Sequence, residues 1–183
     1  MQQDKLQKLE LTWIGKGDEP VLEPRILIEN PEFSYGDSNS GNMLIHGDNL
    51  LSLKALEQDY AGKIKCVYID PPFNTGQAFE HYDDNLEHSI WLNLMHQRIL
   101  ILYNLLDNCG LFWIHLDDTE VHYCKVLLDE IFTRNGFVSH ITYERSGVAG
   151  LGQGGFLVNT TEHILLYKKG SLPNKTNLTR WRN

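Results

Sequence analysis

Cysteine is scarce in this sequence: Cys66, Cys109 and Cys124 are the three among 183 residues. They are widely spaced and form no Cys-x-x-Cys pair, so no metal motif is present and no metal is predicted. Cysteines used in this way are typical of reduced structural thiols, and we therefore expect a cytoplasmic protein.

Long hydrophobic runs are lacking as well. No apolar stretch approaches the ~20 residues that a helix needs to span a bilayer, and the polar start at residues 1–5 is not that of a signal peptide. Hydrophobic residues still make up 42% of the chain, which argues against disorder or a coiled coil. The 183 residues are enough for one domain with a hydrophobic core.

Basic charge is in short supply overall, because 16 Lys and Arg face 24 Asp and Glu, for a net charge of −8. This balance argues mildly against nucleic acid as a partner. The segment 142–183 differs, with six basic and two acidic side chains, a net +4 that leaves −12 for the remainder. Any DNA contact is therefore expected near the C-terminal end or in sequence outside this chain. An acidic enzyme with a solvated basic tail is the alternative.

Hydrophobic spacing divides the chain into an N-terminal arm at 1–41, an α/β core at 42–170 and a basic tail at 171–183. Within the core, strands and helices alternate three times, and such near-continuous apolar strands are typical of a parallel sheet covered on both faces. The predicted strands are Met43–His46, Ile64–Ile69 and Leu111–Leu116. The predicted helices are Asn49–Asp59, one from Glu87 or Ser89 to a C-terminal cap at Gly110, and Thr119–Phe132.

The alternation stops after the third helix. Phe137–Tyr143 and His163–Tyr167 read as two strands with no helix between them, joined by the glycine-rich stretch 146–155. We expect an antiparallel pair at the edge of the sheet.

The most distinctive stretch is Cys66–Gly76, in which a β-branched and aromatic run ends in Asp70, Pro71, Pro72 and Phe73. The two prolines fix φ and remove two backbone donors, so this corner offers a carboxylate and carbonyls without competing N–H groups. Phe73 adds a flat apolar face. The pattern suits the binding of an amine, and we interpret it as an amino-group methylation site.

Acids follow each of the three predicted parallel strands: Asp48, Asp70 and Asp117. Open α/β sheets bind ligands beyond the carboxyl ends of their strands, so the three positions predict a cleft there. Asp117 and Asp118 also stand where a carboxylate caps the next helix. His46 and His115 lie on strands and are expected to be satisfied core or rim residues rather than catalytic bases.

Several stretches together carry a family likeness: Leu11–Lys16, Leu22–Leu27, Leu44–Leu50, Tyr68–Gly76, Asp117–Asp118, Asp129–Phe132 and Glu162–Tyr167. The combination covers nearly the whole chain and resembles the N-terminal catalytic part of type III modification subunits, which are DNA adenine-N6 methyltransferases. The resemblance implies a Rossmann-like, doubly wound α/β methyltransferase sheet, here incomplete and in permuted order.

The resemblance also implies roles for individual residues. The methyl donor is S-adenosylmethionine, and the acceptor is the exocyclic amine of a base flipped out of double-stranded DNA. Asp70 and the Pro71 carbonyl would accept the amine's two N–H groups, next to Pro72, and Phe73 would stack on the base. Asp48 and Asp70 are the implied cofactor-binding acids.

The family's target-recognition region and its C-terminal cofactor loop have no counterpart in this sequence. We therefore expect a catalytic-half fragment that is inactive by itself. The implied partners are a restriction subunit and a second modification subunit. Two alternatives stay open: N4-cytosine methylation, because that amine suits the same corner, and a non-catalytic module that binds DNA or a restriction subunit.

Overall fold

The structure is a computed structural model, and it describes residues 10–18, 21–23, 25–37, 39–74, 87–144 and 160–172. Helix α1 (Asn49–Tyr60) leads into strand β1 (Ile64–Ile69), and helix α2 (His88–Leu105) leads into strand β2 (Leu106–Leu116). Helix α3 (Val121–Phe132) and strands β3 (Phe137–Glu144) and β4 (Thr161–Lys168) follow. Two short 3-10 helices, Pro31–Phe33 and Arg134–Gly136, complete the order.

The four strands form one mixed sheet in the order β1-β2-β4-β3. Strands β1 and β2 are parallel neighbours, as expected for strands joined by a crossover helix, whereas β4 runs antiparallel to both β2 and β3. The predicted antiparallel pair at the sheet edge is therefore confirmed. The glycine-rich stretch predicted to join the pair lies outside the described residues.

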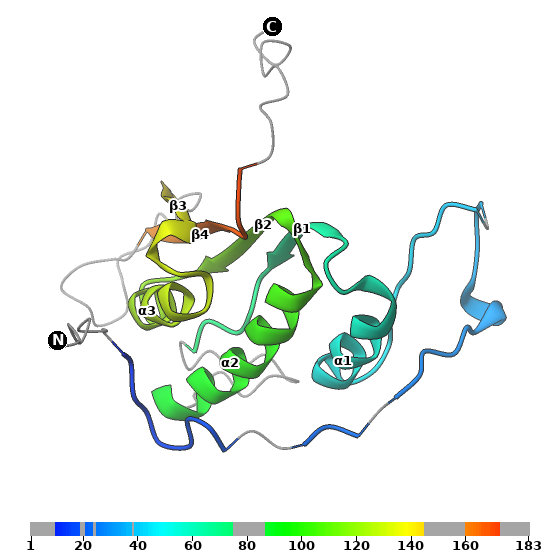
Figure 1. The fold of residues 1–183 in the computed structure, drawn as a ribbon, viewed down its shortest axis with the longest axis horizontal. Helices are drawn as coiled ribbons and strands as arrows, with labels where there is room; N and C mark the ends of the chain where they lie inside the picture. The colour runs from blue at the N-terminus through cyan, green and yellow to red at the C-terminus, as the bar shows by residue number, and fades with distance from the viewer. Residues whose placement is uncertain are drawn as a thin grey trace, which may run out of the picture.

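Helices α2 and α3 lie side by side against one face of this sheet, and α1 packs beside α2 (Figure 1). Alternate residues of β2 point into that layer, so Phe112, Ile114 and Leu116 are fully buried. Further core residues come from the two helices and from β4: Trp91, Met95, Ile99, Leu127, Leu128, Leu165 and Tyr167. The α/β class is confirmed as a partial Rossmann-like sheet.

The opposite face of the sheet is more open. Tyr68 on β1 and Ile141 on β3 are exposed there, and Cys66 is exposed beside Tyr68. Cover on this second face stays a prediction, since the described helices α2 and α3 both lie on the first.

The predicted strand Met43–His46 is wrong. Residues 41–46 have no regular structure, and Leu44 is 99% exposed. A strand is stabilised by hydrogen bonds to a neighbour, and among the described residues no strand pairs with this segment. The hydrophobic composition of the segment suggested a strand but gave no information about a neighbouring strand to pair with it.

The long central helix ends earlier than predicted. Helix α2 stops at Leu105, and Gly110 lies inside β2 instead of following the helix as a cap. A Cβ at Gly110 would lie 2.9 Å from the Asp107 carbonyl oxygen and 3.0 Å from that of Ile64. Gly110 is therefore a position of close backbone approach between β1 and β2.

Contacts from distant residues satisfy the C-terminal end of α2. The Lys169 ammonium donates to the carbonyl oxygens of Tyr103 (2.7 Å) and Leu106 (2.9 Å), and the Gly62 N–H donates to the Asn104 carbonyl at 2.9 Å. These donors replace the capping glycine that the sequence suggested.

Helix α3 also begins later than predicted, at Val121 rather than Thr119. The expected capping role of the acids is seen one turn earlier, because the Asp117 carboxylate accepts from the Thr119 backbone N–H (2.9 Å) and hydroxyl (3.1 Å). This closes a turn ahead of the helix.

Part of the predicted N-terminal arm packs on the helices. The Trp13 indole N–H donates to Asn93 on α2 at 2.7 Å, and Lys16 forms an ion pair with Glu130 on α3 at 2.8 Å. The next described residues run along the outside of the molecule (Figure 1); Val21 and Tyr35 are almost fully exposed.

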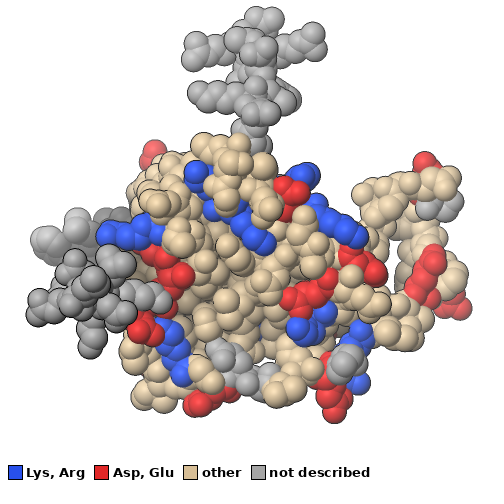
Figure 2. Space-filling view, viewed as in Figure 1, with Lys and Arg blue, Asp and Glu red and all other residues tan. Residues whose placement is uncertain are grey.

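Charges of both signs are interspersed on the face seen in Figure 2, where Lys and Arg alternate with Asp and Glu over the described residues. The described side chains on that face therefore form no continuous basic track for DNA phosphates. None of the helices in the described ranges is long and apolar enough to cross a membrane.

Candidate active site

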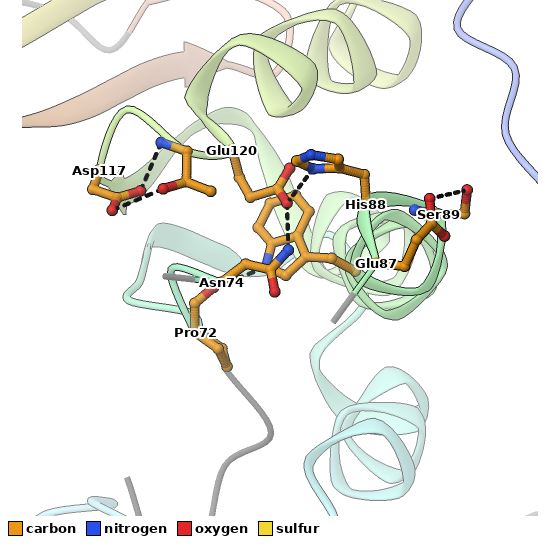
Figure 3. Close-up of polar contacts among 9 residues, drawn as sticks. Pro72, Asn74, Glu87, His88, Ser89, Asp117 and Glu120 are labelled. Carbon is orange, nitrogen blue, oxygen red and sulfur yellow. Dashed lines mark hydrogen bonds and ion pairs between the residues drawn. The ribbon is translucent and has the colours of Figure 1, made fainter. Parts of the chain in front are cut away.

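Asp70, Pro71, Pro72 and Phe73 follow β1 directly and turn the chain at the carboxyl end of the sheet. The Asp70 side chain is 63% exposed, so its carboxylate is open to a ligand. The Trp91 indole N–H donates to the Pro72 carbonyl oxygen at 2.8 Å (Figure 3). One of the two proline carbonyls is thereby engaged by the protein, and that of Pro71 has no donor among the described residues.

Asn74 holds the end of this corner in place through its side-chain amide. Its backbone has φ of 65°, a left-handed conformation that Asn tolerates better than most residues. Its side-chain amide donates to Glu120 Oε1 at 2.6 Å, and His88 Nδ1 lies 2.7 Å from the same oxygen (Figure 3). The corner, the start of α2 and the turn before α3 therefore meet at one carboxylate.

Glu120 is fully buried, and its second oxygen, Oε2, has no hydrogen-bond partner among the described residues. Burial raises the pKa of this carboxyl, and the hydrogen bonds from Asn74 and His88 only partly oppose the effect. The nearby Asp117 carboxylate raises the pKa further. The protonated form of Glu120 is thus favoured by its surroundings.

A second polar group flanks Asp70 on the open face of the sheet. His115 Nδ1 lies 3.3 Å from Asp70 Oδ1, and His115 Nε2 lies 2.7 Å from Glu162 Oε2. The Tyr143 hydroxyl contacts both His115 Nε2 (2.7 Å) and the Glu162 carboxylate. Burial, together with the hydrogen bond to Glu162, raises the pKa of Tyr143 to about 12.

The three acids predicted to share a cleft have different surroundings. Asp70 and Asp117 end the neighbouring parallel strands β1 and β2, as predicted. Asp117 is buried and bonded to Thr119, so it closes a turn. Asp48 follows an irregular segment and caps α1, accepting from the Leu51 N–H at 3.0 Å. Only Asp70 presents a carboxylate directly beside the proline corner.

A family model described as DNA methylase (N6_N4_Mtase) matches residues 64–183, which include the proline corner and all four strands. The chain belongs to this DNA methylase family.

Similar members of the DNA methylase family act in restriction-modification systems, according to their names. The chain is 39% identical over 130 residues to the probable HindVI Mod subunit of Haemophilus influenzae, covering 70% of this chain and 17% of that protein. It is 30% identical over 178 residues to the StyLTI Mod subunit of Salmonella typhimurium, covering 82% of this chain and 26% of that protein.

A type II enzyme is similar as well. M.EcaI of Enterobacter cloacae is 32% identical over 174 residues, and the match covers 89% of this chain and 38% of that enzyme. The chain thus spans well under half the length of these relatives. Among solved structures, the M1.HpyAVI-SAM complex is 20% identical with a TM-score of 0.48, over 73% of this chain and 58% of that one.

Sequence reasoning missed most of the residues that hold this methylase corner. Glu120 carried no recognisable pattern, and the roles of Asn74 and Trp91 could not be predicted, because each meets its partner only after the helices pack. His115 was expected to be a satisfied core or rim residue rather than a catalytic base. One signal was present: Ile69 and Ile114 are partners in the parallel β1–β2 ladder, so the next residues, Asp70 and His115, come side by side.

We expect Glu120 to make the stability of this chain pH-dependent. Its folded-state pKa lies above the ordinary value of 4.5, so its contribution is fully present below pH ~4.5 and is lost as pH rises through the folded-state pKa. Glu120→Gln does not ionise. We expect the free energy of unfolding of the variant, relative to that of the wild type, to increase as pH rises from 4 to 8. Urea denaturation measures the difference.

Glu57→Gln is the matched control, because its shift has the opposite sign. Although burial raises the pKa of Glu57, hydrogen bonds from Lys54 and Asn104 lower it below the ordinary value. Its contribution to stability is present above that value and is lost as pH falls. The free energy of unfolding of Glu57→Gln, relative to that of the wild type, should therefore decrease as pH rises. Two variants that change in the same direction would contradict the assignment.

Proposed function

We propose that this chain carries the base-binding corner of an S-adenosylmethionine-dependent DNA methyltransferase that modifies adenine at N6. The observation that carries the proposal is the corner itself. The exposed Asp70 carboxylate stands beside the Pro71 carbonyl, while the Pro72 carbonyl is already held by Trp91 at 2.8 Å. Two acceptors at one edge match the two N–H groups of an exocyclic amine.

The chemistry requires those acceptors, because the lone pair of an adenine amine is delocalised into the ring and is a poor nucleophile. When Asp70 and the Pro71 carbonyl accept the two N–H groups, the nitrogen becomes pyramidal and its lone pair is directed at the methyl group. Bound S-adenosylmethionine would supply the methyl group at this position, and the amine would release one proton to water. Positioning and fixed charge supply the rate enhancement.

Phe73 provides the apolar face of the same pocket. It packs partly against the hydrophobic core, and its ring meets the edge of His115 with 5.1 Å between the ring centroids. A ring fixed in this way supports stacking of a flipped base, which offsets part of the few kcal/mol that unstacking costs.

S-adenosylmethionine supplies the methyl group as a reactive sulfonium. The residues proposed to contact it are Asp48 and Asp70. Both are exposed acids, and carboxylate oxygens are suitable acceptors for the hydroxyl and amino groups of that molecule. One Asp48 oxygen already accepts from Leu51, which leaves the other for this purpose.

The similarity to Mod subunits supports double-stranded DNA as the substrate and a restriction subunit as a partner. A dimer of modification subunits belongs to the same proposal. Lys168, near the C-terminal end of β4, agrees with DNA contact on that side of the core, whereas the neighbouring Lys169 ammonium is held by carbonyl oxygens at the end of α2.

The test is an analysis of the methylated product. An assembly that contains this chain and binds DNA is supplied with labelled S-adenosylmethionine, and the DNA is digested to nucleosides and separated by chromatography. We expect the label in N6-methyldeoxyadenosine. Label in N4-methyldeoxycytidine would establish the cytosine alternative instead. Absence of label from DNA bound by the assembly would leave the non-catalytic binding module.

A further inference from the structure

His115 contacts both functional members of the proline corner. Its Nδ1 lies 3.3 Å from Asp70 Oδ1, and its ring stands edge-on to Phe73, with 5.1 Å between centroids and 75° between planes. Among the described residues, His115 is the one whose side chain both pairs with Asp70 and makes a ring contact with Phe73. A single imidazole therefore borders the amine acceptor and the stacking ring.

The sheet accounts for this placement. In the parallel β1–β2 ladder, Ile69 pairs with Ile114, so Asp70 and His115 come at the same level and point to the same face. That face is the one opposite the fully buried Ile114 and Leu116, which point into the helix layer. His115 is thus delivered to Asp70 by strand register rather than by a loop.

The other side of the imidazole is fixed by the two edge strands. Glu162 on β4 and Tyr143 on β3 are partners in the antiparallel ladder, and both contact His115 Nε2 at 2.7 Å. The His115 and Glu162 side chains are only 14% and 10% exposed. The ring is therefore held at Nε2, and its Nδ1 faces the more exposed Asp70.

We propose that His115 is a positioning residue that orients the Asp70 carboxylate and the Phe73 ring toward the base amine, with Glu162 and Tyr143 holding it in place. The inference rests on the proposed function of the corner. An Nδ1–H that donates to Asp70 Oδ1 leaves Oδ2 directed at the amine. The 3.3 Å separation is longer than a typical N–H···O hydrogen bond of about 2.9 Å, and we expect it to shorten when the base binds.

Two substitutions separate the sides of the ring. Asparagine carries its amide nitrogen near the place of Nδ1, whereas glutamine carries it near the place of Nε2. His115→Asn should therefore keep a donor beside Asp70 and lose the contact with Glu162, and His115→Gln should do the reverse. We expect kcat to fall roughly tenfold or more in His115→Gln and about threefold or less in His115→Asn, with KM little changed in both.

The same pair of substitutions at His140 is the control, because His140 is an exposed residue of β3 that contacts His163 and not Asp70. Both His140 variants should keep the wild-type kcat. If His115→Gln is as active as His115→Asn or more active, the side facing Glu162 matters more, and the proposal is overturned.

A second measurement avoids variants of His115 altogether. In the isolated chain, the ¹⁵N chemical shifts of the His115 ring are compared between wild type and Asp70→Ala, a substitution at an exposed side chain. We expect the Nδ1 signal to move and the Nε2 signal to stay. An unchanged Nδ1 signal would overturn the contact, and this result is independent of methylation. If the proposed function of the corner were wrong, Asp70→Ala would instead methylate DNA fully in the assembly.

Discussion

Asp70→Ala should lower methyl transfer to DNA roughly a hundred- to a thousand-fold, which is the effect expected when one preorganised polar group is removed from an active site. The variant keeps Pro71 and Phe73 but offers the amine a single acceptor. The amine nitrogen of the base would therefore stay conjugated with the ring and remain a poor nucleophile. The measurement is the single-turnover rate in the assembly that methylates DNA, at saturating S-adenosylmethionine.

The fold should survive this change, because the Asp70 side chain is 63% exposed. Asp59→Ala, at an exposed acid on α1, is the matched control and should methylate at the wild-type rate. A wild-type rate for Asp70→Ala would remove the enzymatic interpretation of the corner and leave only a binding role. A collapse of the unfolding temperature in Asp70→Ala would contradict the exposure seen here.

Phe112→Ala should produce the largest loss of stability, about 3–5 kcal/mol in the free energy of unfolding. Phe112 lies in the middle of β2, is fully buried, and packs against Phe132 with 5.2 Å between ring centroids. Its removal would leave a cavity between the sheet and helix α3. Urea denaturation followed by circular dichroism measures the change.

Ile141→Ala provides the comparison on the same sheet. Ile141 lies on β3, on the open face, and is 38% exposed. Its loss of stability should be clearly smaller than that of Phe112→Ala, since much less apolar surface returns to water. Equal losses at the two positions would mean that the second face is as well covered as the first.

Much of the core could be predicted from local pattern. The spacing of Leu50, Leu53 and Leu56 indicated α1, and the apolar run Ile64–Ile69 matched β1 residue for residue. These elements depend on periodicity within a short segment, which a single sequence displays directly. The proline corner was also visible, because the absence of N–H groups is a property of proline itself.

The errors occurred where an element depends on a distant partner. Met43–His46 has strand-like composition, yet no neighbouring strand pairs with it among the described residues. Helix α2 ends where Lys169, more than 60 residues along the chain, donates to its last carbonyls. Local spacing contains no information about either event.

By itself the sequence predicted the corner Asp70 to Phe73 as the reactive site, and it determined the order of most helices and strands. The tertiary structure decided what surrounds that corner: Trp91 on the Pro72 carbonyl, Glu120 under Asn74, and His115 beside Asp70. The reason is physical. Proline geometry and hydrophobic periodicity act between neighbours in the chain, whereas burial, strand register and hydrogen bonds across the sheet exist only once distant segments have packed together.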